Sequence, residues 1–349
     1  MRRPCPEPPV RPGWLANRSS SRSMFAVYAQ YADAQHPFRA LRVGERPDPD
    51  LSDPAMAGWE PVEVRAASVN HHDLWTLRGV GIAAESFPMI LGCDAAGVDA
   101  AGNEVVLHSV IGDPGESGDE TLDPARSLLS ERFQGSFAEL VAVPRRNLLP
   151  KPAGWSFAEA ACLPTAWLTA YRMLATRAGL RRGDTVLVQG VGGGVATACI
   201  ALAHAMGYRV WATSRDEERR TRALELGADA VFPPGARLPE RVDAVMETVG
   251  EATYDHSLKS LRPGGRLVIS GATSGPNPPA DLARIFFKQL SVVGSTMGTR
   301  DELLDLIRLC ESSGVRPLID QTLPMSEARR ALEIVADGKV FGKIVLTHG

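Results

Sequence analysis

Hydrophobic and polar residues follow different periods in the two halves of the chain. Between Met24 and about Pro152, short stretches such as PVEVRAASV and NEVVLHSV alternate with a period of two, which predicts strands joined by turns. After Ala153, short apolar stretches alternate with segments of helical period: DTVLVQG, VATACIALAHAMG, RVWATS, DEERRTRALELG and VDAVMETVG. Alternating strands and helices predict a doubly wound parallel sheet. We therefore expect an α/β chain whose first part is mainly β-structure.

Two segments fall outside these patterns. Residues 1–23 hold five prolines among their first twelve positions, followed by a Ser/Arg tract. Such a segment cannot bury enough apolar surface to offset its ordering entropy, so we expect a disordered extension ahead of a natural start at Met24. Residues 113–132 are polar, acidic and rich in Pro and Gly, and we expect a surface excursion there.

Length and composition narrow the class of partner. A chain of 349 residues is long enough for two domains. Its 38 Lys and Arg against 41 Asp and Glu give a net charge of −3, which argues against nucleic acid and an anionic membrane and favours a small molecule. The sequence has no run of about eighteen apolar residues and no apolar signal region at its N-terminus, so we expect neither a membrane span nor secretion.

The cysteines agree with a cytoplasmic location. They are odd in number, widely scattered and without any CxxC pair, which favours reduced thiols over a disulfide framework. The same scatter excludes a structural zinc site built from clustered cysteines. The five positions are Cys5, Cys93, Cys162, Cys199 and Cys310.

A glycine-rich loop, QGVGGGVA at residues 189–196, joins the first predicted strand of the second half to its helix. Glycine lets the backbone turn sharply and approach a pyrophosphate, and the helix N-terminus offers unpaired N–H groups to the phosphates. The strand before and the helix after it favour a Rossmann dinucleotide-binding loop over a linker. The residues expected to bind the cofactor are Gly190, Gly192, Gly193, Gly194 and Val195.

The next strand predicts which dinucleotide binds. NAD-binding loops usually carry an acid about twenty residues further on, but here Ser214 ends the strand RVWATS and Arg215 follows it. A hydroxyl and a guanidinium suit a 2′-phosphate, so NADP(H) is favoured over NAD(H). The alternative is that Arg215 begins a helix with a solvated side chain. Three further residues follow strand ends at which ligands of open α/β sheets bind, namely Thr248, Gly271 and Ala272.

Several ordered motifs resemble one family. From about Met24 to the end, AASVNHHDLW, LGCDAAG, GSFAELVAVP, RPGGRLVISGATSG and FGKIVL resemble the medium-chain dehydrogenase/reductases, most closely their quinone oxidoreductase branch. The resemblance implies a GroES-like β-rich catalytic domain made of residues 24–153 and 300–349. A Rossmann domain, residues 154–299, is inserted between them. It also implies that Lys343 lies near the nucleotide domain, where it meets cofactor phosphate; a solvated lysine is the alternative.

The resemblance further implies that the catalytic zinc of the alcohol dehydrogenases is absent. The positions of their three ligands hold Asn70, Cys93 of Gly92-Cys93-Asp94, and Thr165. Asn and Thr are poor zinc ligands, so we expect no metal. A rearranged site made of His71, His72 and Cys93 stays open. Adjacent histidines on an extended segment would point to opposite faces, which argues against that site.

Without a Lewis acid, hydride transfer needs an acceptor that is already electrophilic, such as a quinone, an enone or an enoyl thioester. The catalytic candidates are Asn70 as hydrogen-bond donor to the acceptor oxygen, His72 as proton donor and Asp73 of the same motif. Trp75 and Cys93 are candidates to line the pocket. The alternatives are a hydrogen-bonded structural role for His72 and core positions for Trp75 and Cys93.

The expected function is therefore a zinc-independent, NADPH-dependent oxidoreductase of the quinone oxidoreductase type. An enoyl reductase, a zinc-dependent alcohol dehydrogenase and an NADPH-binding sensor without turnover remain alternatives. By analogy with the family we expect a homodimer or homotetramer, with the apolar strand LSVVGS near Leu290 as a possible edge for pairing.

Overall fold

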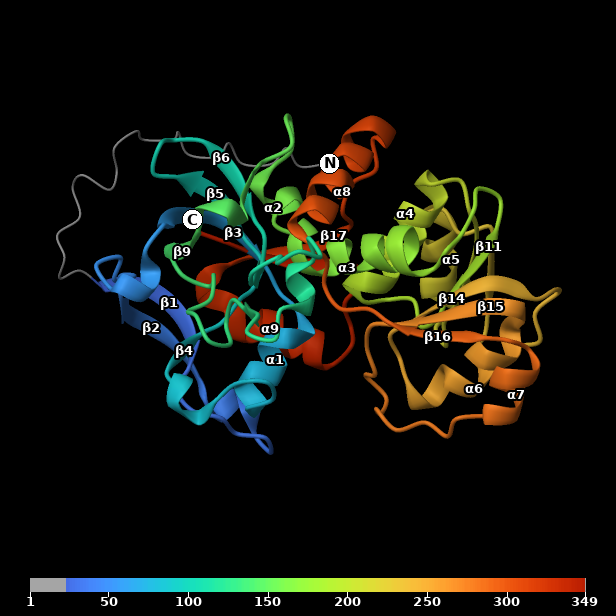
Figure 1. Ribbon diagram of the computed structural model, residues 1–349. Helices are drawn as coiled ribbons and strands as arrows, with labels where there is room; N and C mark the ends of the chain where they lie inside the picture. Colours follow the sequence, from blue (N-terminus) through green and yellow to red (C-terminus); the bar gives the residue numbers. More distant parts are fainter. Residues whose placement is uncertain (1–22, 349) are drawn as a thin grey trace.

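Two large sheets carry the fold in the computed structural model, which describes residues 23–348. One lobe holds the first sheet and both ends of the described chain, and the other holds the second sheet (Figure 1). The prediction of disorder for residues 1–22 lies outside the described residues. Ser23, which we counted in that extension, is the first residue of β1.

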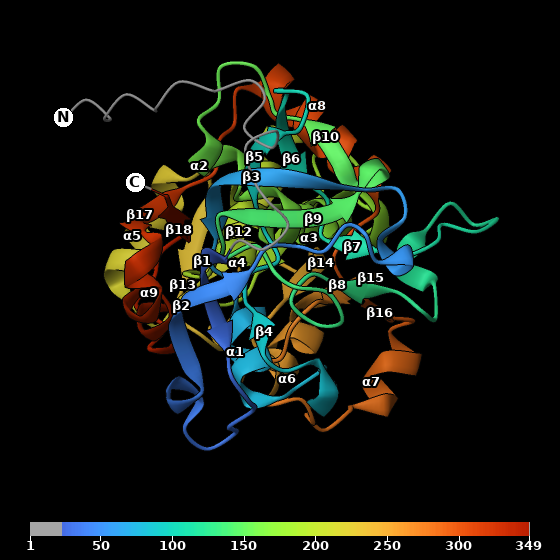
Figure 2. The same ribbon diagram turned by 90° about the vertical axis from the view of Figure 1, so that its left-hand side faces the viewer.

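The first lobe is mainly β-structure. Its seven-stranded sheet has the order β10-β6-β5-β3-β18-β17, with β9 paired to β3 off this path, and a three-stranded sheet with the order β2-β1-β4 lies beside it. Figure 2 shows β3 and β9 side by side in front of the nucleotide lobe. The strands are β1 Ser23–Ala29, β2 Leu41–Pro47, β3 Trp59–Ser68, β4 Met89–Ile90, β5 Ala96–Asp99, β6 Glu104–Leu107, β7 Val110–Ile111, β8 Ser127–Leu128, β9 Leu140–Pro144, β10 Leu148–Pro150, β17 Ile319–Pro324 and β18 Lys343–Thr347.

The C-terminal tail is built into this first sheet. Strand β18 pairs antiparallel with β3 on one side and parallel with β17 on the other, so that Val345 faces Ser68. Residues from both ends of the described chain therefore share one core, which includes Val64, Ala67 and Leu346. The catalytic-domain boundaries at 153 and 300 stay predictions, but the topology joins the two segments as expected.

The second lobe holds a six-stranded parallel sheet with the order β13-β12-β11-β14-β15-β16, as the alternation of strands and helices predicted. Helices α4 and α5 cover one face and α6 and α7 the other (Figure 1). The elements are β11 Thr185–Val188, α4 Gly194–Ala205, β12 Arg209–Thr213, α5 Glu217–Glu225, β13 Ala230–Phe232, β14 Val242–Glu247, α6 Glu251–Ser260, β15 Leu261–Ile269, α7 Leu282–Phe287 and β16 Ser291–Gly294.

The remaining helices lie at the first lobe and the junction. They include α1 His71–Arg78, α2 Phe157–Ala160, α3 Leu168–Tyr171, α8 Arg300–Ser313 and α9 Ala328–Ala336. Residues 157–177 form a largely helical stretch in which α-helical and π-helical segments alternate. Its order is α2, the π-helical η7 Leu163–Trp167, α3, and the π-helical η8 Arg172–Arg177. Short 3-10 turns are η2 Pro37–Arg39, η3 Pro54–Met56, η4 Ala84–Ser86, η5 Glu120–Leu122, η6 Arg145–Asn147 and η9 Met325–Glu327.

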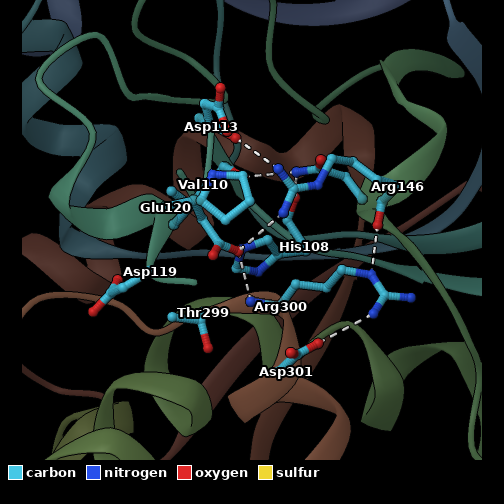
Figure 3. A network of polar contacts seen from close by, with 12 residues as sticks. His108, Val110, Asp113, Asp119, Glu120, Arg146, Thr299, Arg300 and Asp301 are labelled. Carbon is cyan, nitrogen blue, oxygen red and sulfur yellow. Dashed lines mark hydrogen bonds and ion pairs between the residues drawn. The ribbon is translucent and has the colours of Figure 1, made fainter. Parts of the chain in front are cut away.

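The excursion at residues 113–132 is not confined to the surface, so that prediction was wrong from Glu120 onward. Glu120 is 2% exposed and Leu129 is fully buried. Glu120 lies among His108, Arg146 and Arg300 (Figure 3): its Oε1 is 3.0 Å from His108 Nε2 and accepts the N–H of Arg300 at 2.7 Å. A buried carboxylate needs such partners, and these tie the excursion to the start of α8.

No helix within residues 23–348 is long and apolar enough to cross a membrane. The cytoplasmic location stays a prediction.

Candidate active site

The two adjacent histidines begin a helix. We expected an extended segment here, and that was wrong, because α1 starts at His71. Asp73 stabilises this start: its Oδ2 accepts the N–H of Asn70 at 2.8 Å, and its Oδ1 accepts the N–H of Gly92 at 2.9 Å. Burial raises the pKa of Asp73 to about 6. This carboxyl group therefore joins the loop that carries Asn70 to the loop that carries Cys93.

A second buried carboxylate, Asp94, lies at the centre of a polar cluster. Three side chains donate to it: Ser68 Oγ at 2.6 Å, Asn70 Nδ2 at 2.8 Å and Thr165 Oγ1 at 2.5 Å. The thiol of Cys93 is 3.4 Å from Thr165 Oγ1 and 3.7 Å from Asn70 Nδ2. The end of β3, the start of α1 and the π-helical η7 therefore converge on one site.

The ammonium group of Lys343 completes this cluster. The residue is 3% exposed, so a solvated lysine is excluded. Its Nζ donates to the carbonyl of Val69 at 2.7 Å and to Asn70 Oδ1 at 2.6 Å, and lies 3.8 Å from Asp94 Oδ2. The negative charge of the cluster thus has a positive partner within the protein.

The amide of Asn70 is held by protein groups on both ends. Its Nδ2 donates to Asp94 and also lies 3.2 Å from the carbonyl of Ser68, while its Oδ1 accepts from Lys343. The structure thus places Asn70 in the site, but both amide hydrogens already have acceptors. Its donation to a substrate oxygen stays a prediction.

The donors of this cluster do not match a zinc site. One carboxylate, one thiol, an amide and a hydroxyl meet there, so only two of the four are good zinc ligands; burial raises the pKa of Cys93, and Lys343 adds a positive charge. Within residues 23–348, no group of three or more His, Cys, Asp or Glu side chains could hold a metal ion, and this includes His71, His72 and Cys93.

His72 forms a pair with Glu131 from the excursion. Its Nε2 is 3.0 Å from Glu131 Oε1, and the two side chains are 12% and 24% exposed. Burial lowers the pKa of His72, but the interactions with Cys93 and Glu131 outweigh burial and raise that pKa well above its usual value. The buried Nδ1 has no hydrogen-bond partner among the described residues. Its acid form is therefore favoured relative to an ordinary histidine, and its second ring nitrogen is buried without a hydrogen bond among the described residues.

The two predicted pocket residues differ in exposure. Trp75 on α1 is 40% exposed, so it is not a core residue, and its contact with substrate stays a prediction. Cys93 is fully buried and lies within the cluster of Asp94, as described above. The other described cysteines, at positions 162, 199 and 310, are buried and free, in agreement with packing roles.

The glycine loop turns sharply between β11 and α4. Gly190 has a φ of +71°, and a Cβ there would collide with Val249. Gly193 caps α4, and the first helical N–H bond is from Thr197 to Gly193 at 3.1 Å. The earlier N–H groups of this turn, including those of Gly194 and Val195, point out of the helix N-terminus and are available to an anion.

The two residues that follow β12, Ser214 and Arg215, differ in exposure. Ser214 is buried, and its Oγ accepts the N–H of Asp216 at 3.3 Å, whereas Arg215 is exposed. A third residue, Arg219, lies against Gly192, where a Cβ would meet its guanidinium. Arg219 also donates to the carbonyl of Gly338 at 2.5 Å. Arg219 lies in the first turn of α5, four residues after Arg215, and we did not single it out from the sequence.

The ends of β14 and β15 lie together as expected. Gly271 is so close to Thr248 that a Cβ would lie 3.1 Å from the carbonyl oxygen of Thr248, and Ala272 packs against Gly250. The buried Glu247 holds this edge, because its carboxylate accepts the N–H groups of Val249 and Gly250 at 2.8 and 3.1 Å. Whether Thr248, Gly271 and Ala272 touch a cofactor stays a prediction.

Two family models match this chain. Residues 57–153 match the alcohol dehydrogenase GroES-like domain, and residues 194–312 match the zinc-binding dehydrogenase domain. An acryloyl-coenzyme A reductase of Metallosphaera sedula is 30% identical over 319 residues, covering 85% of this chain and 95% of that protein.

Solved structures agree with this match. An NAD-dependent alcohol dehydrogenase has 33% sequence identity and a TM-score of 0.85, over 93% of this chain and 100% of the other. The 2-octenoyl-CoA carboxylase reductase CinF, in complex with NADP and 2-octenoyl-CoA, has 25% identity and a TM-score of 0.86, over 96% of this chain and 89% of the other. This chain therefore belongs to the medium-chain dehydrogenase/reductase superfamily of NAD(P)-dependent oxidoreductases.

Proposed function

We propose that this protein is a zinc-independent reductase that uses NADPH to reduce an alkene conjugated to a carbonyl, with enoyl thioesters as the first substrate class. The main support for this proposal is the cluster around Asp94. An amide, Asn70, and an ammonium group, Lys343, lie in this cluster, and neither is a good zinc ligand. An acceptor that is already electrophilic needs no Lewis acid. Two relatives, an acryloyl-coenzyme A reductase and a 2-octenoyl-CoA carboxylase reductase, are named for such thioesters.

The cofactor supplies a hydride to the electrophilic carbon when bound. The chain's own residues then have two tasks, to orient the acceptor and to deliver a proton. His72 suits the second task, because its interactions with Cys93 and Glu131 raise the pKa of its ring, and its Nδ1 makes no hydrogen bond among the described residues. Asp73 has a positioning role, because its carboxylate accepts the backbone N–H groups of Asn70 and Gly92 and so fixes both loops.

NADPH is the proposed cofactor. Ser214 and Arg215 follow β12 without a carboxylate at the position of Ser214, and Arg219 lies against Gly192 of the glycine loop. Cationic and hydroxyl side chains favour a 2′-phosphate, which an acid at that position would repel.

The test is NADPH oxidation, followed by absorbance, against an enoyl thioester, an enone, a 1,4-quinone and a saturated aldehyde. We expect turnover of the conjugated acceptors, unchanged by a chelator. His72→Gln should lower kcat strongly, while the matched His71→Gln, on the exposed neighbour, should not. Turnover of the saturated aldehyde that is lost with chelator would instead identify a zinc-dependent alcohol dehydrogenase. Tight NADPH binding without oxidation by any acceptor would favour a sensor, and faster turnover of the quinone would move the substrate class to quinones.

We further propose that two copies pair through the face formed by α7 and the edge strand β16. Leu282, Phe286 and Phe287 are 68%, 71% and 78% exposed there, an apolar patch unusual for a free surface. Strand β16 is also the edge of its sheet, and such an edge can pair with a strand of another copy. Phe286→Asp should convert a dimer to a monomer in light scattering; a monomeric wild type would refute the pairing.

A further inference from the structure

We propose that Lys343 is a positioning residue: its buried ammonium group fixes the amide of Asn70 and neutralises Asp94, and its stem ties this pair to the dinucleotide loop. The inference deepens the proposed function and rests on it. Lys343 lies at the start of β18, and its backbone N–H is held by the carbonyl of Leu318 at 2.9 Å.

The burial of Lys343 needs an explanation. An ammonium group that is withdrawn from water is costly unless several acceptors surround it. Here the residue is 3% exposed, and its Nζ has the carbonyl of Val69 at 2.7 Å, Asn70 Oδ1 at 2.6 Å and the carboxylate of Asp94 at 3.8 Å. These partners come from the segment that starts α1 and from the cluster described above. The lysine is therefore built into the site.

Lys343 decides which way the Asn70 amide points. A lysine ammonium donates and never accepts, so it must face the amide oxygen. The carboxylate of Asp94 accepts, so it must face the amide nitrogen, as the 2.8 Å contact shows. The two charges on opposite ends of one amide leave a single favourable orientation. Without the ammonium group, the energy difference between this orientation of the amide and the flipped one would be much smaller.

The stem of Lys343 also touches the dinucleotide loop. A Cβ at Gly194, the first residue of α4, would lie 2.6 Å from the Cδ of Lys343. The neighbouring Gly342 donates its N–H to the carbonyl of Gly192 at 2.8 Å. One short segment thus contacts the loop with its backbone and Asn70 with its side chain, so the occupancy of the loop and the orientation of Asn70 are coupled.

The test is a double-variant cycle with Lys343→Met and Asn70→Ala. We expect Lys343→Met to lower kcat about 10- to 100-fold with a smaller change in the acceptor KM, because a misplaced group costs rate more than binding. The double variant should be no slower than Asn70→Ala alone, since the lysine acts through that amide. Lys343→Arg, which keeps the charge, should recover part of the rate. Lys339→Met, an exposed lysine of the same segment, is the matched control and should behave as wild type.

Two further measurements keep the inference decisive. Lys343→Met leaves Asp94 without its cation, so Lys343→Met/Asp94→Asn is the neutral version if the single variant does not fold, and it should still be slow. Wild-type kcat in this neutral variant, or additive losses in the cycle, would overturn the inference. The same double-variant cycle can also be measured without turnover, with the dissociation constant of NADPH and the Tm of the apoprotein as the two measured quantities. If wild type reduces no acceptor, the proposed function fails, and additive effects on both quantities would then refute the link between Lys343 and Asn70.

Discussion

Arg172 in η8 joins the excursion to α8, and its loss should destabilise the whole chain. Its side chain is 6% exposed; Nη2 is 2.6 Å from Asp119 Oδ2, and Nη1 is 2.9 Å from Glu302 Oε2. Substitution by Met keeps the apolar stem and removes the guanidinium. The two carboxylates, which are 21% and 15% exposed, then lose their shared cation.

The size of the effect follows from this burial. Removing one partner of a buried ion pair costs about 3–5 kcal/mol. Both carboxylates keep other donors, the N–H of Thr121 for Asp119 and that of Thr299 for Glu302, so we expect the low end, about 3 kcal/mol. The unfolding entropy is about 2.1 cal/mol/K per residue, or about 0.7 kcal/mol/K for 349 residues that unfold as one unit. Arg172→Met should therefore lower Tm by about 4 °C.

Differential scanning calorimetry measures this shift. The matched control is Arg308→Met, because Arg308 and Asp305 form a 3.0 Å pair at 66% and 53% exposure, and such pairs contribute less than about 1 kcal/mol. Equal Tm values for the two variants would show that the buried pair contributes no more than a surface one and would refute the reasoning.

Three further outcomes are expected. Because the pKa of His72 is raised, its acid form persists to higher pH than that of an ordinary histidine, and kcat should fall as pH rises through that pKa. Glu131→Gln should move the fall to lower pH, and an unmoved profile would exclude the pair. Ser214→Asp should raise the Kd of NADPH relative to that of NADH in fluorescence titration, and an unchanged ratio would remove this position from cofactor choice. Gly190→Ala should weaken NADPH binding or lower Tm, because its φ of +71° and the contact with Val249 both oppose a Cβ; wild-type values of both would count against the loop geometry.

The fold of the nucleotide domain could be predicted because it depends on patterns among residues that are close together in the sequence. Each strand of the parallel sheet is an apolar run, each helix has its own period, and the glycine loop stands at their first junction. The start of α1 also had a local signal that we did not use, since Asn70 and Asp73 have the spacing of a capping box. The Asn70, Cys93 and Thr165 set was found through the family resemblance.

What the sequence did not predict depends on contacts between distant segments. Glu131 belongs to an acidic stretch that resembles a solvated loop, and nothing next to it in the sequence points to His72. The burial of Lys343 follows from the pairing of β18 with β3, which no period along the chain encodes. The excursion from Glu120 onward was misjudged for the same reason, because Glu120 finds its partners in residues far away in the sequence.

The position of β18 between β3 and β17 also sets an order of assembly during synthesis. The nucleotide domain is a continuous segment and can fold while the chain is still growing. The first sheet cannot close until β18 has left the ribosome, so β3, which β9 pairs only from Trp59 to Glu63, keeps an open edge at residues 66–68 through the synthesis of the whole insert. Such an edge is a template for pairing with other chains. The nascent protein is therefore most prone to aggregate in the interval before its last strand arrives, and a chaperone that shields β3 would have its greatest effect then.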